Sequence, residues 1–421
     1  MIAIIPREPD RGRPTGIRVT GTKTTSPIGR PPLLRRTNAL TLLKLLREAG
    51  TCSRADLVRT SGMSAPTVTN VIADLLSAEL VQPLGEGASN GGRPPDLIRF
   101  KAERGCLASV RITAQFVSFL LTDLCGKELD TSEVLLAGRK TTPVAMCALI
   151  AEEIRRILRA RGLKRPRLLA LVAGVPAITN VDKGVVLAIS TLENWRDVPL
   201  RSMLKRSLGC QVTVENDTNL AALGEQMEGA AQGETSFVEI DIGANVSAGI
   251  VLDGRLYHGA QWSAGEIGYL RLPHLSRRDP VLHEFGVLEE VLSSTAIQQS
   301  WREKTVQLRP TVRGAGRMDV TAILDMAQRG EAAAKQVVKQ RAAMVADMIV
   351  NLSLILNPGL VVLGGEVGRH PALIGFLRKE LERSEFAVPR IAAASLGEAA
   401  VLRGAIAMAL EAIPSILLPL P

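Results

Sequence analysis

Residues 37–104 begin with three runs of apolar positions at helical spacing, separated by short polar turns. The run TNALTLLKLLREAG predicts an amphipathic helix that ends at Gly50. The run SRADLVRTSG predicts a short helix with Ser53 as its N-cap, Asp56 in a capping-box position and Gly62 at its end. The third run, SAPTVTNVIADLLSAEL, places one apolar stripe along a helix, at Val68, Val71, Ile72, Leu75 and Leu76.

Two short strands around a Gly-rich turn are predicted next, by LVQPLGEG and GGRPPDLIRF. Three helices followed by such a hairpin are typical of a winged helix-turn-helix. The third helix turns short hydrogen-bonding side chains and Asp74 away from its apolar stripe, and short polar groups at its N-terminal end suit a DNA major groove. A protein-interaction module is the alternative. The candidate DNA-contacting residues are Arg54, Ser64, Ala65, Thr67, Thr69, Asn70 and Arg93.

Arg93 stands between Gly92 and Pro94 in the predicted wing. A guanidinium on a stiff, narrow loop can reach into a minor groove, where the negative potential is high. The alternative is a turn arginine in solvent.

Residues 105–415 alternate between strand-like and helix-like patterns, which predicts an α/β domain with a mixed sheet. We expect two strands with a turn at Gly126, then a helix and a strand that ends in a Gly/Pro loop. A strand, a polar loop and a helix follow over CQVTVENDTNLAALGEQMEGAA. SFVEIDIGANVSAGIVLDGRLYHG predicts a hairpin-like unit, and a long helix then leads into the buried strand GLVVLGG.

The composition favours a large aliphatic core, because 46% of the residues are hydrophobic and only 3% aromatic. No apolar run reaches the roughly 18–20 residues of a membrane helix, and the N-terminal apolar run is too short for a signal peptide, so we expect a cytoplasmic protein without a membrane partner. None of the five cysteines forms a CxxC pair, which favours buried free thiols. The four histidines lack metal-site spacing, so neither a metal nor a cofactor is predicted.

The net charge of +9 is concentrated at the front of the chain. Residues 1–104 carry 16 basic and 9 acidic side chains, and residues 1–36 alone carry 8 and 2. Residues 1–36 also lack an apolar period, so we expect a mobile basic arm that contacts DNA phosphates or has no role. The excess lies mostly in this arm, and residues 37–104 are nearly neutral.

Three polar groups interrupt apolar, Gly-rich segments of the α/β region. ENDTN places Glu215, Asn216 and Asp217 where a strand meets a helix, a frequent position for ligands. GEIG supplies Glu266, and GVLEE supplies Glu289 or Glu290. Carboxylates and an amide that converge suit a ligand with many hydroxyl groups. For Asp217 the alternative is a helix cap.

These segments resemble the ROK family (repressor, open reading frame, kinase). The motifs are GVPAITNVDKGVVLAISTLENWRDVPL, VTVENDTNLAALGE, IVLDGRLYHGAQWSAGEIGYL and LNPGLVVLGGEVG, with a winged helix in front, and they cover about residues 37–415. The resemblance implies a two-lobed ribonuclease-H-like fold, as in actin and hexokinase. The first lobe would span about residues 105–225 plus the C-terminal helix, and the second about 226–395. The winged helix resembles the xylose-repressor-like branch.

The resemblance also implies site residues. Asn216, Asp217, Glu266 and Glu289 match sugar ligands, and in the kinases the aspartate at the Asp217 position is the catalytic base. Gly174 and Asn194 lie in stretches that border the sugar in relatives. Tyr269 stands where relatives have a histidine that touches sugar and binds zinc, so it either contacts ligand or only packs.

Both phosphate loops depart from the kinase pattern. The position of the DxGGT-like loop has RITAQ at 111–115, with Arg111 in place of the aspartate, and the second loop is GANVSAG, with Asn245 and Ser247 in place of glycines. Backbone amides cradle phosphate only where the chain can come close, and side chains at these positions obstruct it. The zinc cysteines are replaced by Pro280, Leu282 and Val287, and we expect apolar packing by Leu282, Val287 and Leu288 there.

The sequence therefore predicts a transcriptional regulator of carbohydrate metabolism, of the repressor type, without kinase activity. It would bind a double-stranded operator and a sugar-like effector as a homodimer or homotetramer, and would be cytoplasmic and nucleoid-associated when bound to DNA. One alternative is an active sugar kinase with a DNA-binding appendage. Another is a regulator whose sugar pocket has decayed.

Overall fold

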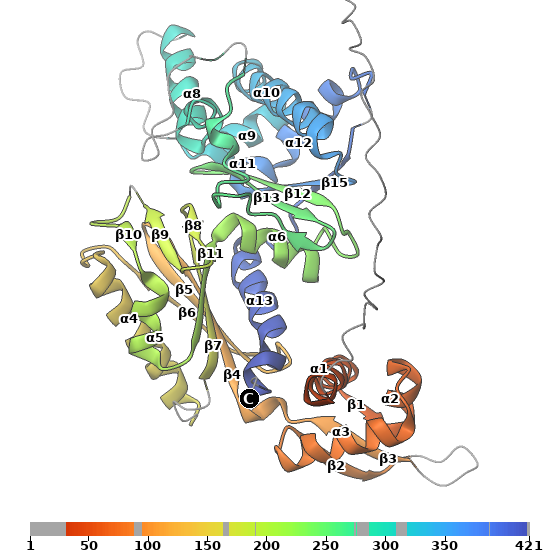
Figure 1. Ribbon diagram of the computed structural model, residues 1–421. Helices are drawn as coiled ribbons and strands as arrows, with labels where there is room; N and C mark the ends of the chain where they lie inside the picture. Colours follow the sequence, from red (N-terminus) through yellow and green to blue (C-terminus); the bar gives the residue numbers. More distant parts are fainter. Residues whose placement is uncertain are drawn as a thin grey trace, which may run out of the picture.

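The chain folds into a small N-terminal unit and two larger lobes, each lobe built on one five-stranded sheet (Figure 1). The computed structural model describes residues 31–87, 95–162, 168–189, 191–272, 275, 286–308, 318–386 and 388–418. The predicted α/β fold, with two lobes behind a winged helix, is confirmed.

The N-terminal unit contains three helices and a three-stranded antiparallel sheet in the order β1-β3-β2. The helices are α1 (Pro31–Ala49), α2 (Arg54–Ser61) and α3 (Ala65–Ser77). The strands are β1 (Thr51–Ser53), β2 (Val81–Glu86) and β3 (Asp96–Phe100). Strands β2 and β3 are the predicted hairpin, whereas β1 is an additional strand that pairs with β3.

Local hydrogen bonds explain the tight turn between α2 and α3. The Ser53 hydroxyl accepts from the amide of Asp56 at 3.1 Å, and the Asp56 carboxylate accepts from the amide of Ser53 at 2.9 Å, so the predicted capping box is present. Gly62 has a φ of 70° and donates its amide to the Val58 carbonyl at 3.1 Å. A side chain at this left-handed position would strain the turn.

The first lobe has a mixed sheet in the order β11-β7-β4-β5-β6, with β11, β7 and β4 parallel. Its strands are β4 (Cys106–Ile112), β5 (Phe116–Asp123), β6 (Glu128–Leu135), β7 (Leu168–Val175) and β11 (Gln211–Asn216). One face packs on α4 (Pro143–Ala160) and α5 (Leu200–Leu208). A small sheet joins the same core and contains β8 (Thr179–Asn180), β9 (Val185–Ala188) and β10 (Arg196–Val198).

The second lobe has a sheet in the order β14-β13-β12-β15-β16. Its strands are β12 (Phe237–Ile242), β13 (Val246–Leu252), β14 (Arg255–Leu256), β15 (Leu360–Gly364) and β16 (Arg390–Ala393). Helices gather over one face: α7 (Glu289–Leu292), α8 (Ser294–Leu308), α9 (Val320–Gln328), α10 (Ala332–Leu356), α11 (Gly365–Gly368) and α12 (Pro371–Leu381). The predicted hairpin and the long helix before a buried strand are therefore confirmed.

Two helices, α6 (Asp217–Glu228) and α13 (Ala400–Leu417), cross between the two sheets (Figure 1). They approach closely because each has a glycine at the crossing. A Cβ on Gly224 would overlap the carbonyl of Ala400, and one on Gly404 would overlap the carbonyl of Leu220. The crossing joins the lobes through backbone surfaces that leave no room for a side chain.

Several sequence expectations are corrected. Helix α1 begins at Pro31, six residues inside the segment predicted as an arm, and residues 1–30 lie outside the described part. The segment expected to hold two strands holds three, because Thr113 makes a further turn between β4 and β5. No loop separates β11 from α6, since the side chain of Asn216 caps the helix directly. Helix α6, assigned to the first lobe, also packs on β12 and β13.

The expectation that no segment has the length and composition of a membrane helix was wrong for one described segment. The helical stretch Gly397–Leu417 passes that test, and 44% of its most apolar window is buried inside the protein. It packs against α6, β4 and β7. A helix in a protein core can have the same length and apolar composition as a membrane helix. Among the cysteines, four are buried as expected, whereas Cys125 is exposed.

Substitution of Gly404 by alanine should destabilise the protein, because the added methyl group would overlap the Leu220 carbonyl. We expect a loss of about 1–3 kcal/mol in the free energy of unfolding, measured by urea denaturation. Gly375→Ala is the matched control, since Gly375 lies in α12 with open space around its Cβ position. The control should gain about 1 kcal/mol from helix propensity. Equal effects of the two substitutions would contradict the close crossing.

Candidate functional site

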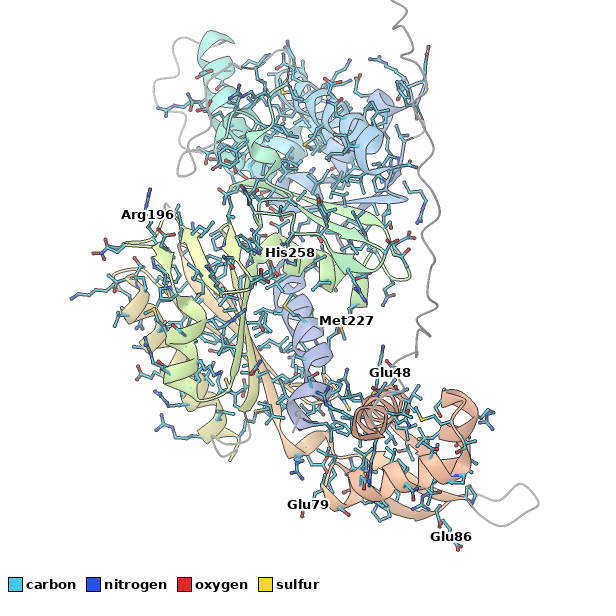
Figure 2. All side chains as sticks on the ribbon, viewed as in Figure 1. Glu48, Glu79, Glu86, Arg196, Met227 and His258 are labelled. Carbon is cyan, nitrogen blue, oxygen red and sulfur yellow. The ribbon has the colours of Figure 1, made fainter. Side chains whose placement is uncertain are left out.

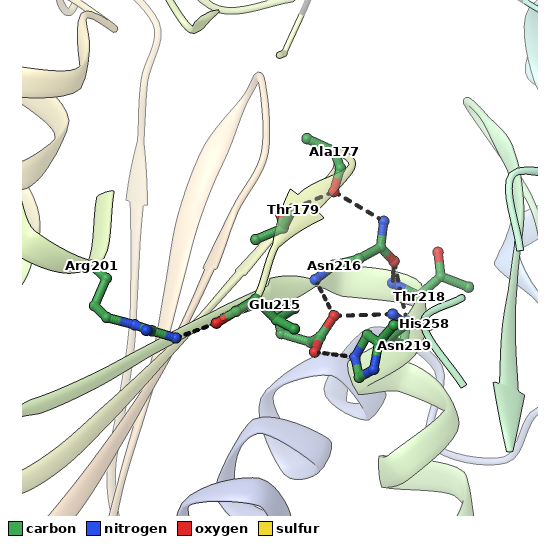
Figure 3. Close-up of polar contacts among 9 residues, drawn as sticks. Ala177, Thr179, Arg201, Glu215, Asn216, Thr218, Asn219 and His258 are labelled. Atoms are coloured by element: carbon green, nitrogen blue, oxygen red, sulfur yellow. Dashed lines mark hydrogen bonds and ion pairs between the residues drawn. The ribbon is translucent and has the colours of Figure 1, made fainter. Parts of the chain in front are cut away.

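The END segment lies where β11 passes directly into α6, at the carboxyl end of a parallel strand. The side-chain oxygen of Asn216 accepts from the amides of Thr218 at 2.9 Å and Asn219 at 3.1 Å, so Asn216 is the N-cap. Its side-chain amide donates to the carbonyl of Ala177 at 3.3 Å (Figure 3). Asn216, rather than Asp217, therefore fills the capping role that was the alternative for Asp217.

Asp217 is partly buried at the first turn of α6 and accepts from the amide of Thr218 at 3.0 Å. Burial raises the pKa of Asp217, and the positive charge of Arg111 acts against that rise. Its carboxylate keeps free acceptor capacity, because a carboxylate has about four lone-pair sites.

Glu215 and His258 form a polar contact across the two lobes, and the sequence did not predict it. Glu215 ends β11 and is only 2% exposed, whereas His258 follows β14 in the second lobe. The ring Nε2 of His258 lies 2.8 Å from the Glu215 carboxylate, which also accepts from the Asn219 side chain at 3.0 Å (Figure 3). Figure 2 places His258 at the junction of the lobes.

The carboxylate of Glu215 raises the pKa of His258 through their hydrogen bond, against the lowering effect of burial. A buried carboxylate needs such a partner. In the sequence, the one indication of the Glu215–His258 contact is an acidic residue, Glu215, inside an apolar strand.

Glu266, Tyr269 and Glu289 lie on neighbouring segments of the second lobe. Glu266 precedes the short helical turn η3 (Ile267–Tyr269), and Gly268 packs against Glu289. Glu289 accepts from the amides of Val246 at 3.0 Å and Gly286 at 2.7 Å, so it holds two loops together. Both of its oxygens already accept one hydrogen bond.

Burial, followed by the charges of Glu289 and Asp217, raises the pKa of Glu266 to about 7. Burial, followed by the charges of Glu289 and Glu266, raises the pKa of Tyr269 to about 12. Tyr269 is therefore a neutral phenol at physiological pH. The two lobes bring these segments together: Thr218, next to Asp217, contacts Ser247 of β13, and the neighbouring Val246 donates to Glu289.

Gly174 and Asn194 are placed differently. Gly174 lies on β7 in register with Arg111 and Glu215, and Leu220 and Val401 occupy the space where its Cβ would point. Asn194 is exposed in a turn with a φ of 61°. The structure thus shows a packing role for Gly174, and it records no contact between Asn194 and the END segment.

The region of the second phosphate loop is closed by internal contacts. The Ser247 hydroxyl lies 2.6 Å from the Thr218 hydroxyl of α6, and the Gly243 amide donates to the Asn245 carbonyl at 3.0 Å. The side chain of Ser247 thus binds the adjacent helix α6.

The segment expected to have lost a zinc site is only partly described. Pro280 and Leu282, and with them His283, lie outside the described residues. Val287 and Leu288 are buried, as the expected apolar packing requires. Among the residues that the structure describes, no group of three or more His, Cys, Asp or Glu side chains is arranged to hold a metal ion.

The N-terminal end of α3 is an exposed polar surface. Ser64, Ala65, Thr69 and Asn70 are exposed and Thr67 is half-buried. Ser64 caps the helix, and its hydroxyl lies 2.8 Å from that of Thr67. Arg54 lies 3.6 Å from Asp96, and Arg93 lies outside the described residues. Asp74 is paired with Arg35 of α1 through two contacts, at 2.6 and 2.7 Å. The exposed groups named above at the N-terminal end of α3 are uncharged.

The model of the ROK family matches residues 107–412, which is the region of both lobes. The chain belongs to the ROK family. The match agrees with the motifs around Asp217 and Glu266, and it begins after the winged helix.

Three relatives illustrate the two branches of the family. The chain is 24% identical to a xylose repressor of Caldicellulosiruptor bescii, over 91% of this chain and 98% of that protein. Its fold is similar to the crystal structure of a ROK family transcriptional regulator, with a TM-score of 0.76 and 23% identity, over 91% of this chain and 98% of the other. A ROK family glucokinase from Streptomyces griseus has a TM-score of 0.59 and 23% identity, and the match covers 72% of this chain and 99% of that enzyme. Of these three, the two regulators match nearly the whole chain, whereas the glucokinase match covers the region of the two lobes.

The Glu215–His258 contact should make stability depend on pH. The raised pKa of His258 means that the contact stabilises the fold below the ordinary histidine pKa, about 6.5, and loses this effect as pH rises through the raised value. We expect His258→Gln to destabilise the protein more at about pH 5.5 than at about pH 8.5, measured by urea denaturation. Other titrating groups, such as Glu266, are present in both proteins and cancel in the difference. A pH-independent difference would show that His258 is not protonated in the contact.

Proposed function

We propose that this chain is a DNA-binding transcriptional regulator of the repressor type, whose ROK domain senses a sugar or sugar derivative. The observation that carries the proposal is one apolar core shared by the winged helix and the ROK domain. It includes Leu42 and Leu46 of α1, Val172 of β7, and Ile406 and Leu410 of α13. A DNA-binding unit that packs into the sensor domain can respond to changes there.

The winged helix would bind the operator through the exposed N-terminal end of α3. Ser64, Thr67, Thr69 and Asn70 offer donors and acceptors there without a competing charge. Arg54 beside the recognition helix and Arg93 in the wing would add contacts to DNA. Two copies of the chain would span two half-sites, as expected of a dimeric or tetrameric regulator in the cytoplasm that associates with the nucleoid on binding.

The sugar would bind between the lobes, against Asp217 and Glu266. Both carboxylates can accept hydroxyl protons, and Tyr269 can donate or accept one. Asn216 and Glu289 would position the site and add single contacts, since each already holds backbone amides. Gly174 and Asn194 would shape its border.

The ligand signal would pass along α13. At one end, Glu398, just before α13, pairs with Arg111 of β4. At the other end, the carbonyl of Leu410 accepts from Arg47 at 2.6 Å, and that of Leu418 accepts from Arg36 at 2.9 Å. Helix α13 thus contacts both the interlobe region and α1. A ligand with different affinity for two lobe arrangements would change the separation of two recognition helices.

An active sugar kinase with a DNA-binding appendage is the competing function. The relatives matched over nearly the whole chain favour regulation, and the closed loops around Thr113 and Ser247 disfavour phosphoryl transfer. ATP-dependent phosphorylation of any sugar in a hexose and pentose panel would establish the kinase instead.

A thermal-shift screen with the same sugars distinguishes the proposed sensor from a regulator whose sugar pocket has decayed. A bound ligand raises the melting temperature, by an amount that grows with its concentration. No shift with any sugar or sugar derivative would leave the ROK domain as a dimerisation scaffold only.

Replacement of Glu266 and of Asn70 should separate sensing from DNA binding. We expect Glu266→Ala to abolish the thermal shift by the effector and to leave operator affinity within about twofold. Asn70→Ala should weaken operator binding by about tenfold, equivalent to the loss of one base contact, and leave the thermal shift unchanged. Fluorescence anisotropy with the operator, located first by genomic footprinting, measures the affinity. Loss of both the thermal shift and the operator affinity in either variant would contradict this division of roles.

The contact between Arg47 and Leu410 should carry part of the coupling. Arg47→Met keeps an apolar stem of similar length but removes the hydrogen bond to the Leu410 carbonyl of α13. We expect the effector to bind as before while its effect on operator affinity falls by about fivefold. Lys44→Met on the same helix is the matched control, because Lys44 is exposed and its amine lies 3.9 Å from Glu48 of its own helix. If both variants retain full coupling, the signal takes another route.

A further inference from the structure

Aromatic side chains are rare in this chain, and several of them lie in one loop of the second lobe. The 421 residues include three tryptophans and two tyrosines, and both tyrosines and one tryptophan fall within residues 257–269. Trp195 and Trp301 are buried, with exposed fractions of 2% and 9%, whereas Trp262 is half-buried. Trp262 is therefore the tryptophan whose ring keeps surface for a contact outside the protein core.

The loop that carries Trp262 begins at the first lobe. The amide of Ala264 donates to the carbonyl of His258 at 3.2 Å, so residues 258–264 form a closed turn. At the start of this turn, Nε2 of His258 lies 2.8 Å from the carboxylate of Glu215, which is the first residue of the END segment (Figure 3). The turn is thus held against the strand end that carries the proposed sugar ligands of the first lobe.

The other end of the loop leads into the GEIG motif. The carbonyl of Gly265 accepts from the amides of Ala248 and Ile267, both at 2.7 Å. A Cβ on Gly265 would lie only 1.9 Å from the carbonyl oxygen of Ala248, so the chain presses closely on β13 here. Glu266 follows Gly265 directly, four residues after Trp262. Trp262 therefore lies between two parts of the proposed sugar site, one from each lobe.

The backbone of Trp262 has a conformation that a bulky residue seldom adopts. Its φ is 58°, in the left-handed region. Six described residues other than glycine have a positive φ, four of them Asn or Asp, and Trp262 is the one aromatic residue among them. Asn and Asp visit this region with the help of short polar side chains, which a tryptophan lacks. Residues held in such conformations cluster at binding sites, where the side chain has a role beyond the stability of the fold.

We propose that Trp262 is a further sugar-contacting residue, whose indole stacks on the C–H groups of one face of a pyranose ring. The proposal rests on the sugar-sensing function, and it adds an apolar surface to the carboxylates of Asp217 and Glu266. Ligand sites combine an apolar or aromatic surface with a few polar groups that fix the orientation of the ligand. The face of an aromatic ring is negative, so it attracts the partly positive hydrogens of C–H groups.

Tryptophan fluorescence tests this contact in the wild-type protein. Acrylamide should quench mainly Trp262, because Trp195 and Trp301 are buried. Glucose, xylose and N-acetylglucosamine are first screened by thermal shift, and a sugar that raises the melting temperature is then added to the quenching assay. We expect it to lower the quenching constant by about twofold, because a bound sugar covers the indole. Trp301→Phe should show the same protection, and Trp262→Phe should show none.

Two further substitutions separate the contact from the stability of the fold. Trp262→Ala and Trp262→Gly both remove the ring, but only glycine adopts a φ of 58° without strain. We expect each variant to bind the sugar about fivefold more weakly than wild type, from the concentration dependence of the thermal shift. Without sugar, Trp262→Gly should melt at least about 1 °C above Trp262→Ala, so that equal losses of affinity accompany unequal stabilities.

The possible results distinguish a failure of the Trp262 contact from a failure of sugar sensing. A sugar that stabilises wild type without protecting Trp262, or that binds Trp262→Ala as tightly as wild type, overturns the contact and leaves sugar sensing in place. If no sugar stabilises wild type, the sensing function and the contact are both overturned. The quenching of wild type decides the role of Trp262 even if the alanine and glycine variants do not fold.

Discussion

The packing of α13 through the centre of the molecule is the interaction on which the other parts depend. Its apolar side chains belong to one core with α1, the first sheet and α6, so the winged helix is not an appendage on a free linker. Gly404 allows the backbone of α13 to touch that of α6, which in turn packs on the second sheet. Because protein interiors are close-packed, a shift between the lobes must be taken up along this path.

The interlobe region holds partly buried carboxylates from both lobes, and removing a charge from water costs free energy. Two basic groups offset them: His258 contacts Glu215, and Arg111 pairs with Glu398. Burial and neighbouring charges raise the pKa of Glu266 and of Asp241 to about 7. Protonation of these two groups therefore reduces the remaining excess of negative charge. The charge state of the cleft is thus set largely by the protein's own residues.

Local patterns predicted most of the fold because they depend on neighbours in sequence. The capping box of Ser53 and Asp56 and the apolar stripe of α3 are examples. The failures lie where the decisive contact is distant or unusual. The turn at Thr113 contains neither Gly nor Pro and is made by a hydroxyl, so β4 and β5 looked continuous. The partners of His258 and Arg111 are 43 and 287 residues away, and no spacing rule reaches them.

The proposed sugar ligands Asp217 and Glu266 are different residues from Arg111 and Ser247, which hold the neighbouring loops in place. In the proposed sugar site, the carboxylates of the END and GEIG motifs would accept hydrogen bonds from hydroxyl groups. A guanidinium at residue 111 and a hydroxyl at residue 247 instead tie the loops to Glu398 and Thr218. The first contact joins β4 to the segment just before α13, and the second joins β13 to α6. The contacts of residues 111 and 247 therefore fasten the cleft to α6 and to the segment before α13, and α13 leads to the winged helix.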